Sequence, residues 1–317
     1  MTTPPLLEQA KALADETRLR LLRVLWEHEL AVGEIVHVLG LGQSRISRHL
    51  RILSGAGLLV SRRDGQRVHY AVPEAGPGRE LLDALAPFLA HPALEADVRA
   101  AGRAVARRAE RTAAFFAAHA GAWDELRERS LGGLDLAGEI LARMPGGVAV
   151  AADLGCGTGA LLRAMRPGAG RVIGVDSSPE MLARARRVFG AEADGAAPGV
   201  SLRIGDLEHL PLGDGEADFA VMSLALHHLP VPRLGLEEAH RVLAPGGRFV
   251  LVDFEPHDDE SMRERYGDNW LGFDPARVQG WLAAAGLHTD ETARYPLPSG
   301  LVLRLYGARK PSLEEQR

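Results

Sequence analysis

The feature that most constrains this chain is a short apolar run leading into a cluster of glycines. Val148–Leu154 is followed by Gly155-Cys156-Gly157-Thr158-Gly159 and then by a helix-forming segment, residues 160–166. A strand, a glycine loop and a helix in this order let the backbone approach a ligand closely and aim helix N-terminal amides at it. The pattern predicts an α/β fold with a ligand at the carboxyl ends of parallel strands.

The glycine loop alone fits more than one ligand. Gly155, Gly157 and Ala160 satisfy the dinucleotide pattern G-x-G-x-x-G/A, which leaves NAD open. Asp153 precedes the loop, where it would repel a pyrophosphate and suits a ligand with a cationic amino group, such as S-adenosylmethionine. Asp176 ends the next predicted strand, 21 residues after Gly155, where a carboxylate can accept hydrogen bonds from both ribose hydroxyls.

Strands and helices continue to alternate towards the C-terminus. Further parallel strands are predicted at residues 171–175, 200–204, 218–223 and 248–253, and two antiparallel strands at residues 287–291 and 301–308. Asp206 and Leu207 follow the third strand, where they can read an adenine amino group. We therefore expect a Rossmann-like, seven-stranded, doubly wound sheet.

The front of the chain has a different organisation. Residues 6–14, 18–30, 32–39 and 43–53 are predicted helices, with Asp15 as a cap and Gly40 as a left-handed stop. In the fourth helix the i, i+4, i+7 spacing places the apolar residues Ile46, Leu50 and Leu53 in the core. The outward side chains can bond phosphate oxygens and guanine edges, as a recognition helix in the major groove does: Ser44, Arg45, Ser47, Arg48 and Arg51.

A hairpin is predicted after this helix, with strands at residues 58–63 and 66–72. Asp64-Gly65 gives a type I′ turn signal between them. Such a wing would lay Arg62, Arg63 and Arg67 along the flanking DNA backbone or minor groove. Residues 40–70 hold six arginines and one acidic residue, a local charge of +5 in a chain whose net charge is −5.

A long helix is predicted in the middle of the chain, because residues 93–118 are rich in alanine and carry a stripe at helical spacing that includes Val105, Thr112 and Phe116. This helix either transmits a conformational change from the second domain to the first or is only a packed linker, and the packed linker is the favoured interpretation. The length of 317 residues suggests about two domains. We expect a winged helix at residues 1–90, a helical connector and lid at 91–147, and a ligand-binding domain at 148–317.

The front segments LADETRLRLL, ELAVGEIVHVLGLGQSRISRHLRIL and GLLVSRRDGQRVHYAV resemble the ArsR/SmtB winged-helix repressors. The resemblance implies a homodimer, formed through the first helix and residues 79–90, that reads a palindromic double-stranded DNA operator. Ala31 and Gly33 stand where the family's metal-sensing cysteines would sit, so arsenite sensing there is not expected. The resemblance implies DNA contacts from Gln43, Ser44, Ser47, Arg48 and His49.

The segments DLGCGTG, VIGVDSSPEML, GDLEHLPL and RVLAPGGRFVLVDF resemble class I S-adenosylmethionine-dependent methyltransferases, over about residues 110–310. The resemblance implies that Asp153, Gly155 and Gly157 hold the methionine end, Asp176 the ribose, Met181 the adenine face, and Asp206 with Leu207 the adenine edge. Gly159 and Ser177 complete the expected cofactor-binding set, and Trp123 is a candidate cap over the site.

No catalytic residue stands out. The five candidates near strand ends do not form a recognisable catalytic arrangement: His227, His228, Asp253, His257 and Tyr266. No metal site is expected: none of the front histidines, His28, His37, His49, His69 and His91, has a close carboxylate or histidine at ligand spacing. The single cysteine argues against arsenic methylation. The longest uncharged run has 14 residues, short of the about 20 that cross a bilayer. Without a secretory pattern either, we expect a cytoplasmic protein.

Two functions follow from these patterns. In the first, a DNA-binding regulator uses its methyltransferase-like domain to sense S-adenosylmethionine or S-adenosylhomocysteine, with a tie to methionine recycling. In the second, that domain is a working small-molecule methyltransferase and the front domain autoregulates. The sequence leans towards the first, because no acceptor chemistry stands out.

Overall fold

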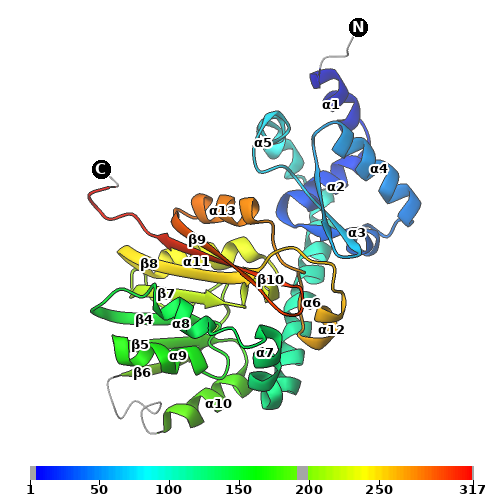
Figure 1. The fold of residues 1–317 in the computed structure, drawn as a ribbon. Coiled ribbons are helices and arrows are strands. Elements are labelled where there is room, and N and C mark those ends of the chain that lie inside the picture. Colours follow the sequence, from blue (N-terminus) through cyan, green and yellow to red (C-terminus); the bar gives the residue numbers. More distant parts are fainter. Residues whose placement is uncertain (1–4, 191–198, 316–317) are drawn as a thin grey trace. The chain divides into compact units, whose positions relative to one another are not determined.

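The computed structural model describes residues 5–190 and 199–315. The chain divides into two compact units, residues 1–108 and 109–317, so the predicted connector at 91–147 is shared between them (Figure 1). The first unit carries a small antiparallel sheet among helices, and the second a seven-stranded sheet with helices on both faces. Within the described ranges, no helix is both long and apolar enough to span a bilayer.

The first unit is a winged helix-turn-helix. Its strands pair in the order β1-β3-β2, and β2 and β3 form the wing. The elements in chain order are α1 Pro5–Leu13, α2 Glu16–Glu27, β1 Leu30–Ala31, α3 Val32–Leu39, α4 Gln43–Gly55, β2 Val60–Asp64, β3 Arg67–Ala71, α5 Pro77–Leu89 and the short 3-10 helix Pro92–Leu94.

Local signals explain where these helices begin and end. Asp15 caps α2 by accepting a hydrogen bond from the Arg18 amide at 3.0 Å, an interaction usually worth about 1 kcal/mol. Gly40 ends α3 in the left-handed conformation, as expected. The prediction that the second helix runs to Leu30 was wrong: the helix ends at Glu27, and Leu30 begins β1, where it pairs with Tyr70.

The predicted hairpin is present, but its turn lies one residue later than Asp64-Gly65. Asp64 pairs with Arg67 at the end of β2, which leaves Gly65 and Gln66 as the turn. Gly65 has φ +60°, whereas Gln66 is not among the residues with positive φ, so the turn is not of type I′. Asp64 is 3% exposed, and its place inside the ladder explains the shift.

The long helix α6, Glu95–His119, is present as predicted and belongs to both units. Its first part is held in the winged helix by three ion pairs. Arg20 contacts Asp97 at 2.7 Å and Arg23 contacts Glu95 at 3.2 Å, both from α2. Arg108 contacts Glu34 of α3 at 2.6 Å.

The second unit confirms the predicted Rossmann-like sheet, with the strand order β6-β5-β4-β7-β8-β10-β9. Strands β4 to β8 pair in parallel, and β10 runs antiparallel to both β8 and β9. The strands are β4 Val148–Leu154, β5 Ala169–Asp176, β6 Val200–Ile204, β7 Ala217–Ser223, β8 Leu243–Phe254, β9 His288–Pro296 and β10 Val302–Arg309. The helices are α7 Trp123–Leu131, α8 Leu136–Leu141, α9 Ala160–Met165, α10 Pro179–Phe189, α11 Pro232–Val242, α12 Ser261–Arg265 and α13 Pro275–Ala284, with 3-10 turns at Ala120–Ala122, Arg166–Gly168 and Leu226–His228.

Side chains on the two faces of the sheet form two cores. Ala152 and Leu154 of β4 pack in one core with apolar residues of α11 and α13. Ala151 of the same strand packs in the other core with Ile140 of α8 and Leu162 of α9. This double burial explains why the central strands read as continuous apolar runs, as parallel strands covered on both faces do.

Candidate functional sites

The outward face of α4 carries the polar residues predicted to read DNA. Ile46, Leu50 and Leu53 are fully buried, as expected from their spacing. The opposite face leaves Arg48 and Arg51 exposed. The exposed set on this helix also includes Gln43, Ser44 and Arg45, and Ser47 is half-buried.

Several of the predicted DNA-contacting side chains already have partners within the unit. The Arg45 guanidinium donates to the Thr17 hydroxyl at 3.1 Å. His49 is half-buried, with Nδ1 3.7 Å from Asp15. In the wing, Arg62 contacts Glu29 at 3.1 Å. These contacts orient the side chains and compete with any phosphate.

The two remaining wing arginines are exposed. Arg63 donates to the Gly65 carbonyl at 2.9 Å, and Arg67 lies on the far side of the turn. Because neither is buried, both guanidiniums are accessible to a phosphate. The structure thus brings together an exposed basic face on α4 and an exposed basic wing tip within one unit.

A cavity of about 350 Å³ lies in the second unit, at the carboxyl ends of the central strands. Asp153 at the end of β4 and Ser223 at the end of β7 line it. The chain goes from β4 to β5 and β6 on one side and then returns to β7 on the other, so the strand order reverses here. Such a switch point is where open α/β sheets bind ligands, and the volume suits a nucleoside-sized molecule.

The glycine loop between β4 and α9 is fixed from several sides. The amides of Gly155 and Cys156 both donate to the Val175 carbonyl at 2.9 Å. Gly155 has φ +90°, and a Cβ there would lie 2.8 Å from that of Ala225, so this position needs glycine. The Asp176 carboxylate accepts from the Gly157 amide at 2.8 Å and from the Ser178 amide at 2.9 Å.

The carboxyl groups of buried Asp153 and half-buried Asp176 line the same cavity. Burial, opposed by the charge of Arg127 and supported by that of Asp176, raises the pKa of Asp153 to about 7. Burial also raises the pKa of Asp176, although amide hydrogen bonds from Ser178 and Gly157 oppose it. Two such groups make a negatively charged, low-dielectric wall that favours a cation.

The cavity brings together all but one of the residues expected to hold the cofactor. Gly159 instead packs against α10, where a Cβ would lie 3.2 Å from that of Ala185. Trp123, the candidate cap, lines the cavity as well. The residues lining it from the expected set are Asp153, Gly155, Gly157, Asp176, Ser177, Met181, Asp206 and Leu207.

Part of the cavity wall was not predicted from the sequence. The last part of α6 contributes five residues to it: Ala109, Glu110, Thr112, Ala113 and Phe116. Thr112 and Phe116 were recognised as a helical stripe, but the stripe alone does not say what it faces. Phe116 packs edge-on against Trp123 and His228.

Three of the five catalytic candidates meet beside this cavity. His227 Nδ1 lies 2.8 Å from Asp253 Oδ1. Burial alone would lower the pKa of His227, but Asp253 and Asp268 raise it to about 9. His228 lines the cavity, and burial together with neighbouring His227 lowers the pKa of His228 well below its usual value. Asp268 was not among the candidates.

The other two candidates lie further from the glycine loop. His257 Nδ1 accepts from the Asp259 amide at 3.3 Å. Tyr266 borders a second, smaller cavity together with His227 and His228. Cys156 is a buried free thiol, and burial raises its pKa well above the usual value, so it stays protonated.

Family comparisons agree with this division. The model of the bacterial regulatory protein arsR family matches residues 15–61, and the methyltransferase-domain model matches residues 152–251. The arsenic resistance transcriptional regulator ArsR1 of Pseudomonas putida is 51% identical over 69 residues, which cover 22% of this chain and 52% of that protein. An arsenite methyltransferase of Halobacterium salinarum is 33% identical over 144 residues, covering 44% of this chain and 34% of that protein. The chain thus spans about half or less of the length of these two curated relatives.

Among solved structures, a chain from the Haloferax volcanii complex between the Trm112 methyltransferase activator and a methyltransferase is similar to the second part of this chain. The two chains are 27% identical, and their alignment covers 62% of this chain and 97% of the Haloferax chain, with a TM-score of 0.52.

Proposed function

The chain joins an ArsR-family helix-turn-helix domain to a methyltransferase domain, and from that premise we propose that it is a DNA-binding transcriptional regulator with S-adenosylmethionine or S-adenosylhomocysteine as its effector. The ligand binds in the cavity at the carboxyl ends of the strands, and its binding changes the affinity of the winged helix for an operator. The regulated genes then belong to methionine and S-adenosylmethionine recycling.

The chemistry of the cavity supports this ligand. The methionine amino group is cationic and suits the carboxyl group of Asp153, while Asp176, which lines the same cavity, would accept from ribose hydroxyls. Met181, 1% exposed, offers an apolar surface to adenine. Asp206 and Leu207 line the same cavity and would contact the adenine edge.

The exposed face of α4 supports operator binding by a homodimer. Arg48 and Arg51 on that face and Arg63 and Arg67 on the wing supply the positive charge that phosphates attract. Exposed apolar residues on α1 and α5 support self-association: Leu6, Leu7 and Phe88 are 64%, 47% and 77% exposed.

The observation that carries the effector role is the course of α6. Three ion pairs hold residues 95–108 of this helix to α2 and α3 in the winged helix. Residues 109–116 of the same helix supply one wall of the cavity. A ligand that favours one position of α6 therefore acts on a helix that is also fixed to the helix-turn-helix by ion pairs. A coupling free energy of about 1–3 kcal/mol is enough for regulation.

A working small-molecule methyltransferase is the alternative. His228 lines the cavity beside Phe116 and Trp123, so one nitrogen base lies within an aromatic-walled space that an acceptor could enter. In-line transfer moves the methyl group from the sulfonium sulfur to the acceptor, leaves S-adenosylhomocysteine and gives the acceptor's proton to a base. A metalloid acceptor is disfavoured, because the chain has one cysteine and that thiol is buried.

Fluorescence anisotropy with a labelled fragment of the protein's own promoter tests the proposal. We expect the apparent Kd for DNA to change about fivefold or more with saturating S-adenosylhomocysteine or S-adenosylmethionine, and not with adenosine. An unchanged Kd, with both ligands bound, would refute the effector role. Release of S-adenosylhomocysteine from S-adenosylmethionine in the presence of candidate acceptors would favour the alternative.

A further inference from the structure

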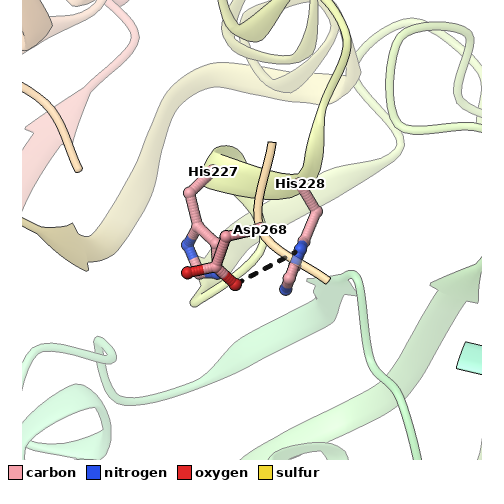
Figure 2. A group of neighbouring side chains, drawn as sticks. All are labelled: His227, His228 and Asp268. Atoms are coloured by element: carbon pink, nitrogen blue, oxygen red, sulfur yellow. Dashed lines mark ion pairs between the residues drawn. The ribbon is translucent and has the colours of Figure 1, made fainter. Parts of the chain in front are cut away.

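A buried cluster beside the cavity joins His228 to two side chains that neither proposed function uses. His227, His228 and Asp268 point towards one another, as Figure 2 shows, and their candidate ligand atoms all lie within 4.8 Å of one another. His227 Nε2 lies 3.5 Å and His228 Nδ1 4.0 Å from Asp268 Oδ1. We infer that these three side chains form a binding site for a divalent first-row metal ion, with Zn²⁺ as the best match.

The distances between the donor atoms suit such an ion. Zinc bonds to imidazole nitrogen and carboxylate oxygen are about 2.0–2.2 Å long, so tetrahedral ligand atoms lie roughly 3.4 Å apart. The 3.5 Å separation between His227 and Asp268 already matches this value. His228 Nδ1 lies 4.0 Å from Asp268, and the three donor atoms are spread over as much as 4.8 Å, so His228 has to move inward to bind the same ion. Nδ1 of His228 also lies 3.3 Å from the Gly267 carbonyl, so metal binding would require His228 to give up this long hydrogen bond.

The His227 ring is oriented for a metal by the group behind it. Asp253 Oδ1 accepts from Nδ1 of His227, and Oδ2 accepts from the backbone amide of the same residue at 3.2 Å. The Nδ1 proton is therefore committed to Asp253, and Nε2, which faces Asp268, would bind a metal ion by releasing its own proton. A carboxylate behind a histidine in this way fixes the tautomer and raises the ligand's basicity at metal sites.

The loop that carries Asp268 is fixed to the two histidines by backbone contacts. The amides of Asn269 and Trp270 both donate to the His227 carbonyl at 3.1 Å. The Asn269 side chain donates to the His228 carbonyl at 2.6 Å, and the Trp270 indole donates to the Leu229 carbonyl at 2.8 Å. Two segments about 40 residues apart in sequence are thus held in one arrangement before any ion arrives, which reduces the cost of ordering the ligands.

Charge and space also favour a cation. Asp253 and Asp268 are two carboxylates whose side chains are 3% and 0% exposed, so a cation between them is stabilised by both. A divalent ion with neutral histidines balances both carboxylates. The adjoining cavity of about 20 Å³ has room for one water or ion and is lined by all three side chains.

The ion would lie next to the larger cavity, since His228 lines both spaces. Three protein ligands leave a coordination position, as catalytic zinc sites do. The inference stands apart from the effector role, because metal content can be measured whether or not the chain binds an adenosyl ligand or DNA.

Equilibrium dialysis of the chelator-treated full chain against Zn²⁺, followed by elemental analysis, tests the site. We expect about one Zn²⁺ per chain, with affinity reduced at least a hundredfold in His228→Ala and in Asp268→Asn. His257→Ala is the matched control, because it removes a histidine outside the cluster, and should leave the affinity unchanged. Circular dichroism establishes that each variant is folded.

Substitution with Co²⁺ gives a second measurement, the visible absorption of the bound ion, which does not depend on the stability of the variants. Tetrahedral nitrogen and oxygen ligation should give visible absorption bands in the wild-type chain that weaken in His228→Gln. Uptake of less than about a tenth of an equivalent of Zn²⁺, or equal uptake by wild type and the cluster variants, would overturn the inference. The cluster would then be an ion pair in which a protonated His227 bridges Asp253 and Asp268.

Discussion

Nη2 of Arg108 lies 2.6 Å from Oε2 of Glu34, in an ion pair whose arginine side chain is 5% exposed. The Glu34 carboxylate also accepts from the Ala31 amide at 2.8 Å, at the start of α3. Burial would raise the pKa of Glu34, but the hydrogen bond and charge of Arg108 lower it below its usual value. The pair therefore fixes α6 to the first helix of the helix-turn-helix, directly before the part of α6 that lines the cavity.

Weakening this ion pair should uncouple the two binding sites. In Glu34→Gln the amide can still contact the guanidinium, but the charge is lost, so we expect the ligand's effect on DNA affinity to fall from fivefold or more to less than about twofold. Glu27→Gln is the control, because it removes the exposed partner of Arg23 on α2. Anisotropy titrations measure both, and an undiminished ligand effect in Glu34→Gln would argue against α6 as the connection.

Removal of the Asp176 carboxylate should abolish ligand binding. Asp176→Ala deletes the acceptor for the ribose and for the Gly157 amide, so we expect affinity for S-adenosylmethionine to fall more than about a hundredfold, since hydrogen bonds to charged groups are worth about 1.5–3 kcal/mol each. Calorimetry measures the loss. Asp214→Ala, which breaks an exposed pair with Arg241, should bind normally. Equal weakening in both variants would indicate a loss of folding instead.

Operator binding should depend on the exposed face of α4. Arg48→Ala removes one cation, so we expect affinity to fall about tenfold and the slope of log K against log salt to decrease by about one if Arg48 contacts a phosphate. Arg233→Ala, an exposed arginine paired with Glu237 on α11, is the matched control. If Arg48→Ala left both quantities unchanged while Arg233→Ala altered them, the assignment of the DNA-binding face would be wrong.

Ligand affinity should rise with pH. The pKa of Asp153 is raised to about 7, so its carboxyl group is neutral below that pH and negative above it. The negative form attracts the cationic amino group, and affinity for S-adenosylmethionine should increase roughly tenfold between pH 6 and pH 7.5. Asp153→Asn should flatten the profile. A wild-type affinity that is flat over this range would exclude Asp153 as the partner of the amino group.

The sequence predicted element bounds and site residues best where local backbone geometry and the burial pattern agree. Val148–Leu154 and Val32–Leu39 have the predicted bounds, because glycine follows each segment and ends it. Asp153, Asp176 and Asp206 were predicted to meet, and the cavity brings them together, because parallel strands place their carboxyl ends at one edge.

Other features depended on contacts that no local pattern encodes. The apolar stripe of α6 identified Thr112 and Phe116 as inward-facing, but helical spacing does not say whether a stripe faces a core or a cavity. Asp268 lies in a loop about 40 residues after His228, so its approach to the two histidines follows only from how that loop packs. The turn of the wing was misplaced because Asp64-Gly65 reads as a turn pair, whereas Asp64 is buried within the ladder.

The most direct test of the account is reciprocity between ligand and DNA. The factor by which S-adenosylhomocysteine changes operator affinity must equal the factor by which operator DNA changes affinity for S-adenosylhomocysteine. Calorimetric titration of the ligand into the free protein and into the protein–DNA complex measures the second factor. We predict that it differs from one by fivefold or more and matches the anisotropy value. Equal ligand affinities with and without DNA would contradict the claim that the cavity regulates the winged helix.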